Sequence, residues 1–179
     1  KGSNAIKRVE RMIEEGADII DIGGVSSRPN APVVSAKDEL ERLKPILASI
    51  KEAKLYERVK FSIDSYEPIV ISEAMESGFK IVNDITGLAN DEVCKLSAEY
   101  DATVVIMHMQ GTPQTMQNNP TYNSVLNDVY AFLQERTQKA QSFGINDVVL
   151  DVGIGFGKTL KDNLRLIKHL EHFQTLGKP

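Results

Sequence analysis

Short apolar runs alternate along the chain with longer amphipathic stretches. The runs are rich in Ile, Val and Leu and predict strands at residues 18–22, 59–63, 80–83, 103–107 and 147–150. Runs that are apolar throughout suit parallel strands covered by helices. The amphipathic stretches predict helices at residues 4–15, 36–54, 68–77, 91–99, 122–142 and 161–173. The pattern therefore indicates an α/β protein built of repeated β/α units.

Residues that favour helix ends stand at several of these boundaries. Ser35, with Asp38 three positions later, is typical of a capping box, and Pro68 suits a first helical position. Glycines that can terminate a helix follow three of the predicted helices, at Gly16, Gly78 and Gly144. These end signals agree with the alternation that the apolar pattern predicts.

Two architectures satisfy a β/α alternation, a doubly wound sheet and a (β/α)₈ barrel. Polar and glycine residues recur immediately after each predicted strand, which is where a barrel has its active site. A whole barrel has eight strands and about 250 residues, whereas this chain has 179 residues and five predicted strands. We therefore expect residues 1–179 to form one partial barrel domain that lacks the first and the last strands. The start on Lys1, in place of Met, agrees with a missing beginning.

Composition and charge narrow the classes of function. With 41% hydrophobic and 26% charged residues, the chain has the balance of an ordinary globular domain. A formal net charge of -4 gives no general attraction for nucleic acid or an anionic membrane, so we expect neither as a partner. No apolar run approaches the roughly 20 residues that span a bilayer. The single cysteine, Cys94, cannot form an intramolecular disulfide, which favours a reducing cytoplasm.

Polar residues follow the first three predicted strands. The first strand leads through two glycines into residues 26–29, a Ser-Ser-Arg-Pro loop that can approach an anion or form a mobile surface connection. The second strand delivers Asp64, and the third delivers Asn83 with Asp84. Such groups can serve a ligand or cap the next helix or turn. Asp21 stands before the end of its strand and is interpreted as a structural carboxylate.

The fourth and fifth strands end in segments with more specific chemistry. Met107 is interpreted as a flat apolar wall, and the neighbouring His108 receives no role. No second histidine stands at metal-ligand spacing from His108, so a zinc site is not expected. Asp151 precedes a glycine loop whose spacing fits neither a P-loop nor a dinucleotide fingerprint. The two oxygens of Asp151 suit two neighbouring N–H donors, and the loop would let Phe156 close over something flat.

Taken in order, these motifs resemble the dihydropteroate synthases. The segments that carry the resemblance are Asp-Ile-Ile-Asp-Ile-Gly-Gly, Ser-Ser-Arg-Pro, Ser-Ile-Asp-Ser, Val-Asn-Asp-Ile, Met-His-Met-Gln-Gly-Thr-Pro and Asp-x-Gly-x-Gly-Phe-Gly-Lys. Their order and spacing agree over nearly the entire chain. The resemblance implies a TIM barrel of folate biosynthesis. It would condense 6-hydroxymethyl-7,8-dihydropterin pyrophosphate with p-aminobenzoate to give 7,8-dihydropteroate and pyrophosphate.

The resemblance also assigns candidate site residues. It implies pterin contacts for Asp64, Asn83, Met107, Asp151 and Phe156. It implies a p-aminobenzoate site, where sulfonamides compete, at Ser27, Arg28 and Pro29. Asp64 is the expected catalytic group, because a carboxylate near the pterin can stabilise the positive charge that develops as pyrophosphate leaves.

A magnesium ion and a homodimer are further implications of the resemblance. The magnesium ligand is expected on the family's first strand, before Lys1, so no metal ligand is assigned to this chain, and the chain alone is expected to be inactive. Four positions depart from the usual family pattern, namely Val25, Ser27, Val152 and Ile154. Ser27 keeps a hydroxyl, whereas Val25 removes a charge and Val152 changes loop stiffness. We expect these changes to affect loop order and drug response more than the reaction.

Two other interpretations stay open. One is a methyltetrahydrofolate-dependent corrinoid methyltransferase, although residues 107–113 favour the synthase. The other is a fragment that binds a pterin without catalysis. Competition by a sulfonamide separates the synthase from the methyltransferase, and turnover separates either enzyme from a binding module.

Overall fold

Five parallel strands form one sheet in the order in which they occur in the chain. A computed structural model describes residues 2–29 and 31–179, and leaves Lys1 and Asn30 outside the described residues. The strands are β1 (Ile19–Gly23), β2 (Lys60–Asp64), β3 (Ile81–Asp84), β4 (Thr103–Met107) and β5 (Val148–Asp151). Each strand pairs with the next. A doubly wound sheet reverses its strand order at a switch point, so the unbroken order confirms the barrel arrangement.

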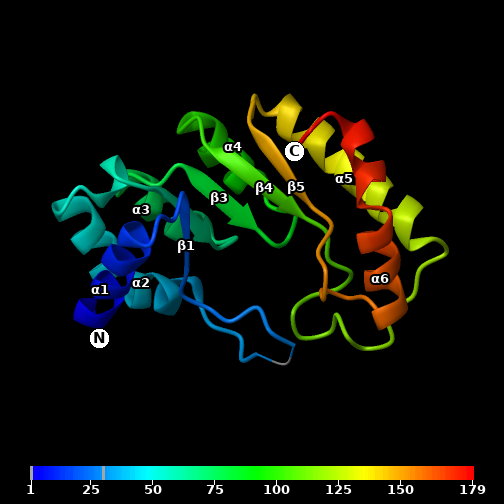
Figure 1. The fold of residues 1–179 in the computed structure, drawn as a ribbon, viewed down its shortest axis with the longest axis horizontal. Helices are drawn as coiled ribbons and strands as arrows, with labels where there is room; N and C mark the ends of the chain where they lie inside the picture. The colour runs from blue at the N-terminus through cyan, green and yellow to red at the C-terminus, as the bar shows by residue number, and fades with distance from the viewer. Residues whose placement is uncertain (1, 30) are drawn as a thin grey trace.

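Helices connect the strands and cover one face of the sheet. They are α1 (Gly2–Glu14), α2 (Ala36–Glu52), α3 (Pro68–Glu76), α4 (Asp91–Glu99), α5 (Val125–Ser142) and α6 (Leu160–Lys168), with the short 3₁₀ helices η1 (Leu55–Glu57) and η2 (Leu170–Leu176). The strands run through the middle of the molecule, with α1 and α2 toward one end of the sheet and α5 and α6 toward the other (Figure 1). No helix within residues 2–29 and 31–179 is both long and apolar enough to cross a membrane.

All five predicted strands are present, most of them shifted by one residue, whereas two helix predictions were wrong at one end. The helix predicted to start at residue 122 begins at Val125, because the Ser124 side chain caps its first turn by accepting from the Asn127 N–H. Tyr122 lies in the preceding loop, where its hydroxyl donates to the Gly157 carbonyl. The helix predicted to run to residue 173 ends at Lys168, and the chain continues beyond His169 as η2.

The predicted helix ends mostly agree with the structure. The Ser35 hydroxyl accepts from the Asp38 backbone N–H at 3.1 Å and donates to the Asp38 carboxylate at 2.7 Å. Pro68 occupies the first turn of α3. The three predicted stop glycines have positive φ angles of 92°, 94° and 85° at Gly16, Gly78 and Gly144. A capping box that we did not predict starts α6, where Thr159 and Asp162 bond reciprocally.

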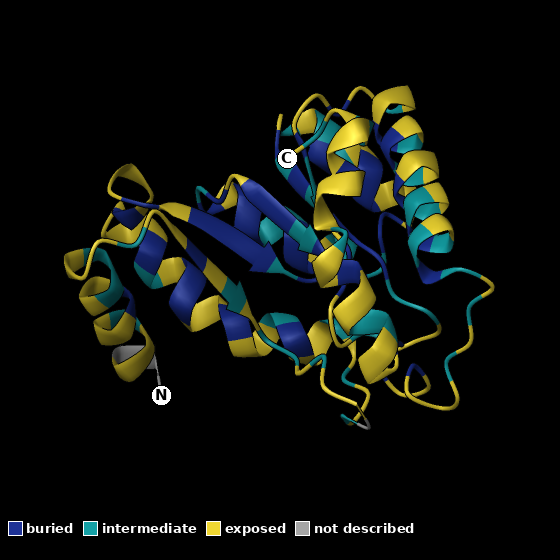
Figure 2. Ribbon diagram, turned by 45° about the vertical axis from the view of Figure 1, so that its right-hand side comes forward, coloured by how far each residue is buried: buried dark blue, intermediate teal, exposed yellow. Residues whose placement is uncertain are grey.

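The hydrophobic core lies between the sheet and the helices. Successive side chains of a strand point to opposite faces, and one face carries the fully buried Phe61, Ile63, Val82, Val104 and Ile106. Buried residues concentrate in the strands and on the helix sides that face them (Figure 2). Cys94 belongs to this core, where burial raises the pKa of its thiol. The opposite face, which we call the open sheet face, is lined by Ile19, Asp21, Lys60, Ser62, Lys80, Ile81, Asn83, Thr103, Val105, Val149 and Asp151.

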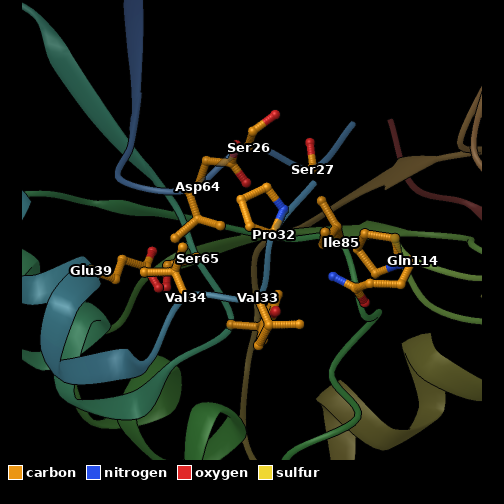
Figure 3. Close-up of a pocket in the computed structure, with 13 residues that line it drawn as sticks. Ser26, Ser27, Pro32, Val33, Val34, Glu39, Asp64, Ser65, Ile85 and Gln114 are labelled. Atoms are coloured by element: carbon orange, nitrogen blue, oxygen red, sulfur yellow. The ribbon is translucent and has the colours of Figure 1, made fainter. Parts of the chain in front are cut away.

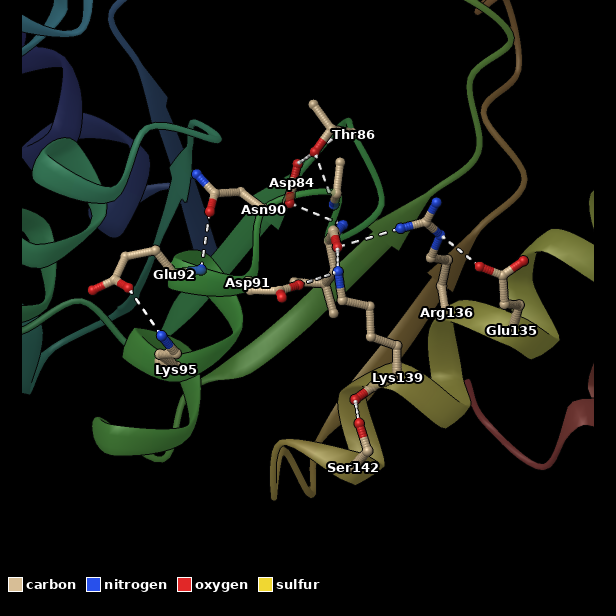
Figure 4. Close-up of polar contacts among 12 residues, drawn as sticks. Asp84, Thr86, Asn90, Asp91, Glu92, Lys95, Glu135, Arg136, Lys139 and Ser142 are labelled. Atoms are coloured by element: carbon tan, nitrogen blue, oxygen red, sulfur yellow. Dashed lines mark hydrogen bonds and ion pairs between the residues drawn. The ribbon is translucent and has the colours of Figure 1, made fainter.

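The turn after β3 is held by a buried carboxylate. Asp84 accepts from the Thr86 backbone N–H at 2.7 Å, from the Thr86 hydroxyl at 2.6 Å and from the Leu88 N–H at 3.0 Å. Burial raises the pKa of Asp84, and these hydrogen bonds oppose the rise. The Lys139 ammonium of α5 donates to the Leu88 carbonyl at 2.8 Å and pairs with Asp91 at 2.7 Å (Figure 4). Asp84 therefore has a structural role, as the capping interpretation of this residue proposed.

Replacement of Asp84 by Asn tests this role. In Asp84→Asn, one acceptor oxygen becomes an NH₂ group, which leaves one of the buried N–H groups without a partner, and we expect a loss of about 1–3 kcal/mol in the free energy of unfolding. Asp91→Asn is the matched control, because the ion pair of the exposed Asp91 is screened by solvent and should contribute little to stability. Urea denaturation at pH 8 measures both. Equal losses in the two variants would contradict the structural role of Asp84.

Candidate functional site

The candidate pterin residues meet at the carboxyl edge of the sheet. In the parallel register, Asp64 stands opposite Gly23 on one side and Asn83 on the other. Met107 stands opposite Asp151. Neighbouring strands lie about 4.8 Å apart, so the register brings together side chains that are far apart in the sequence.

Asn83 and Asp151 both line the open sheet face. The Asn83 side-chain NH₂ donates to the Asp21 carboxylate at 3.2 Å. Asp21 lines the same face and therefore joins the candidate site, although its position in the sequence had been interpreted as that of a structural carboxylate. Its alternation with the buried Ile20 and the half-buried Ile22 could have placed it there, because residues two apart on a strand share a face.

A second hollow, which we call the loop cleft, lies where the loops after β1 to β4 converge. Its lining includes Ser27 and Val25 from the first loop, Asp64 with Ser65 at the end of β2, and Gln114 from the loop after β4 (Figure 3). Of the three candidate p-aminobenzoate residues, Ser27 lines the cleft, whereas Arg28 and Pro29 are exposed and do not line it.

Acidic groups accumulate around the loop cleft. Burial raises the pKa of Asp64 to about 6, and nearby carboxylates, first of all Asp21, add to the rise. Glu39 of α2 also lines the cleft and is only 4% exposed. Burial raises the pKa of Glu39 as well, while the Ser65 hydroxyl lowers it. Glu39 was not predicted as a site residue, because its place on a helix gave no sign that it would face a cleft.

The glycine loop (residues 152–159) is organised around the ammonium group of Lys158. Its Nζ donates to the carbonyls of Gly153 and Phe156 at 2.8 Å each and to the His108 carbonyl at 3.2 Å. Lys158 is 3% exposed. Burial lowers its pKa to about 8, and Asp151 acts against that shift. No role was predicted for Lys158, since the glycine spacing does not fit a P-loop and so removes the usual reason to single out this lysine.

Three further side chains hold the glycine loop. The Gln117 amide donates to the Gly155 carbonyl at 2.9 Å, and the Tyr122 hydroxyl donates to the Gly157 carbonyl. The Gly155 N–H donates to the Asn163 side-chain oxygen at 2.9 Å. Because Gln117 and Tyr122 belong to the loop between β4 and α5, the two loops form one hydrogen-bonded unit.

The remaining candidate residues surround this unit. Asp151 is exposed, and its Oδ1 accepts from the Gly153 N–H at 2.8 Å. Phe156 is half-buried, whereas Met107 is only 3% exposed. The structure thus brings Asp64, Asn83 and Asp151 to one edge. It does not place Met107 or Phe156 in the lining of either hollow.

His108 has a structural environment. Its ring lies edge-on to Phe132 with the ring centroids 4.9 Å apart, and burial lowers its pKa to about 3. A neutral ring at physiological pH follows from that shift, so His108 is not suited to carry a proton there. Within residues 2–29 and 31–179, no three His, Cys, Asp or Glu side chains are grouped so that they could hold a metal ion.

The raised pKa of Asp64 makes a pH-dependent prediction. Because the folded value of about 6 exceeds the ordinary value of 3.8, the stabilising effect of Asp64 is fully present below pH 3.8 and is lost as the pH rises through about 6. We expect Asp64→Asn to gain stability relative to the parent between pH 4 and pH 8, by up to about 3 kcal/mol. Urea denaturation across this range measures the difference. A difference that stays constant with pH would contradict the shift.

Comparisons with known proteins identify relatives of this chain. The family model described as "Pterin binding enzyme" matches residues 1–179. The dihydropteroate synthase of Haemophilus influenzae is 42% identical over 177 residues, which cover 98% of this chain and 63% of that protein. A Yersinia pestis dihydropteroate synthase, solved in complex with a sulfonamide drug, superposes with a TM-score of 0.93 at 34% identity. The superposition covers 100% of this chain and 65% of that one.

A third relative is the Thermus thermophilus dihydropteroate synthase in complex with 4-aminobenzoate. It has a TM-score of 0.88 and 38% identity over 97% of this chain and 65% of its own. The chain spans between 46% and 63% of the length of the first curated relatives that it matches. The family match along the whole chain and the identity of these relatives show that this chain belongs to the pterin binding enzyme family.

Proposed function

We propose that this chain carries the pterin site of a dihydropteroate synthase. The observation that carries the proposal is the meeting of Asp64, Asn83 and Asp151 at one edge of the sheet, beside a glycine loop that is fixed through its backbone. The relatives named above are dihydropteroate synthases, one of them solved with a sulfonamide and another with 4-aminobenzoate. These ligands belong to those proteins and support the same substrate class here.

Asp151 and Asn83 supply the polar edge that a pterin requires. One oxygen of Asp151 is occupied by the Gly153 N–H. The other accepts no hydrogen bond from any side chain or backbone group of the described residues, so it can accept from the amidine-like edge of a pterin. Asn83 is held by Asp21 on the same face, with its side-chain oxygen left to accept a second donor.

Asp64 is suited to stabilise the charge that forms in the reaction. The bond from the pterin methylene carbon to the pyrophosphate oxygen breaks, and pyrophosphate leaves with the bonding electron pair. The amine nitrogen of p-aminobenzoate then bonds to that carbon and loses a proton. With a pKa of about 6, Asp64 is ionised at pH 8 and can stabilise the electron-poor pterin. Ser27, which lines the loop cleft together with Asp64, is proposed to contact the p-aminobenzoate.

Magnesium, a homodimer and a cytoplasmic location complete the proposal. The described residues offer no grouped ligands for a metal ion, so no step is assigned to magnesium through this chain. Four apolar side chains of α6 and η2 are exposed and offer a face to a second copy, namely Leu160, Leu164, Ile167 and Leu170. The free thiol of Cys94 supports the cytoplasm, where thiols stay reduced.

Pterin binding tests the proposal. Calorimetric titration with 6-hydroxymethylpterin, in the presence of pyrophosphate and magnesium, compares the parent chain with Asp151→Asn, which turns an acceptor oxygen into a donor group. We expect a dissociation constant about tenfold or more higher in the variant, as for a lost charge-assisted hydrogen bond. Asp147→Asn is the matched control, because Asp147 precedes β5 and lies at the opposite end of the strand.

Each outcome of this titration has a definite meaning. Parent and control that bind alike, with weaker binding by Asp151→Asn, support the site. Equal binding by all three proteins contradicts the role of Asp151. If none of them binds, the proposal of a pterin site in this chain is wrong. Formation of dihydropteroate that a sulfonamide suppresses supports the synthase, whereas methyl transfer from methyltetrahydrofolate supports the methyltransferase.

A further inference from the structure

Lys158 is a buried cation whose hydrogen-bond partners are all backbone carbonyls. Its three donors are used by Gly153, Phe156 and His108, and no carboxylate of the described residues lies within ion-pair distance of Nζ. Taking an ammonium group out of water is costly unless it is hydrogen-bonded. A buried lysine in this arrangement therefore holds specific backbone atoms in place and does not neutralise a partner charge.

Gly153 connects this cation to Asp151. The Gly153 carbonyl accepts from Lys158, and the Gly153 N–H donates to the Asp151 carboxylate. Gly153 has a φ of 69°, and a Cβ at this position would lie 1.9 Å from the His108 carbonyl oxygen. The residue is thus confined on both sides by Lys158 and Asp151 and cannot turn without breaking one of these hydrogen bonds.

Two other tethers of the glycine loop end at different carbonyls. Gln117 holds the Gly155 carbonyl, and Tyr122 holds the Gly157 carbonyl. Neither Gly155 nor Gly157 bonds to Asp151. Substitutions at different tethers can therefore separate a general loss of loop order from a loss of Asp151 alignment.

We propose that Lys158 is a positioning residue for pterin recognition, which fixes Gly153 so that the second oxygen of Asp151 stays aimed at the N–H donors of the ligand. The inference rests on the proposed pterin site. Its consequence concerns selectivity: an aligned carboxylate discriminates strongly between an edge with two donors and an edge on which one donor is replaced by an acceptor.

The test compares two probes that differ at that edge. 6-Hydroxymethylpterin carries an amino group where 6-hydroxymethyllumazine carries a carbonyl oxygen. Calorimetry gives the ratio of their dissociation constants for the parent, Lys158→Met, Asp151→Asn, the double variant and Tyr122→Phe. Hydrogen exchange of the Gly153 amide reports on the Asp151 hydrogen bond without any ligand.

We expect Lys158→Met to lower the preference for the pterin about tenfold, the equivalent of one hydrogen bond to a charged group. Exchange of the Gly153 amide should become faster in the same variant. The double variant should match Asp151→Asn, because Lys158 acts through that carboxylate and the two effects are then not additive. Tyr122→Phe should leave the preference and the Gly153 exchange unchanged.

Other outcomes overturn the inference. Lys158 would have a structural role only if Lys158→Met lowered the affinities for both probes equally. The same conclusion would follow if the effects of the Lys158 and Asp151 substitutions were additive in the double variant. If Asp151→Asn does not change the binding of either probe, the proposed function is overturned instead. The exchange of the Gly153 amide then still decides whether Lys158 fixes Gly153. If Lys158→Met does not fold, Lys158→Arg takes its place in the test, because it keeps the charge but not the compact ammonium group. An unchanged preference for the pterin in Lys158→Arg also overturns the inference.

Discussion

The parallel pairing of successive strands, each in register with the next, is the constraint on which the rest of the structure depends. It places every carboxyl end of a strand on one edge of the sheet, so residues from five separate chain segments become neighbours. This register directly places Asp64 next to Asn83 and Met107 next to Asp151. The helices contribute by burying the other face, which leaves the open sheet face to polar groups.

The loops at this edge are ordered through their backbone carbonyls by long side chains. Lys139 and Arg136 of α5 both donate to the Leu88 carbonyl in the turn after β3, as Lys158 does to carbonyls of the glycine loop. A carbonyl held in this way fixes the chain path and leaves the neighbouring side chains free to meet a ligand. Asp64 shows the cost of burying a carboxylate at this edge: it accepts no hydrogen bond from the described residues, and burial disfavours its ionised form.

The sequence predicted the elements of this fold better than the contacts between its loops. Apolar runs and helix-end residues are local signals, and all five strands and most helix ends agree with them. The start of α5 was placed three residues too early, although its cap Ser124 is a local signal. What the neighbouring sequence does not reveal is the hydrogen bond from Tyr122 to a glycine 35 residues further along the chain. Glu39 and Lys158 were missed because contacts that define their positions come from other segments, the Ser65 hydroxyl near Glu39 and the His108 carbonyl at Lys158. Asp21, in contrast, carried a usable signal in the alternation of its strand.

The approach of Gly153 and Gly157 to the loop after β4 limits how this protein can vary. A Cβ at either position would collide with backbone atoms of His108 or Gln110, which cannot swing aside as a side chain can. Ile154 is exposed, and Val152 belongs to the hydrophobic core, where side chains of similar size and polarity can replace one another. Side-chain size in this loop is therefore far less restricted at positions 152 and 154 than at the two glycines that lie against the loop after β4.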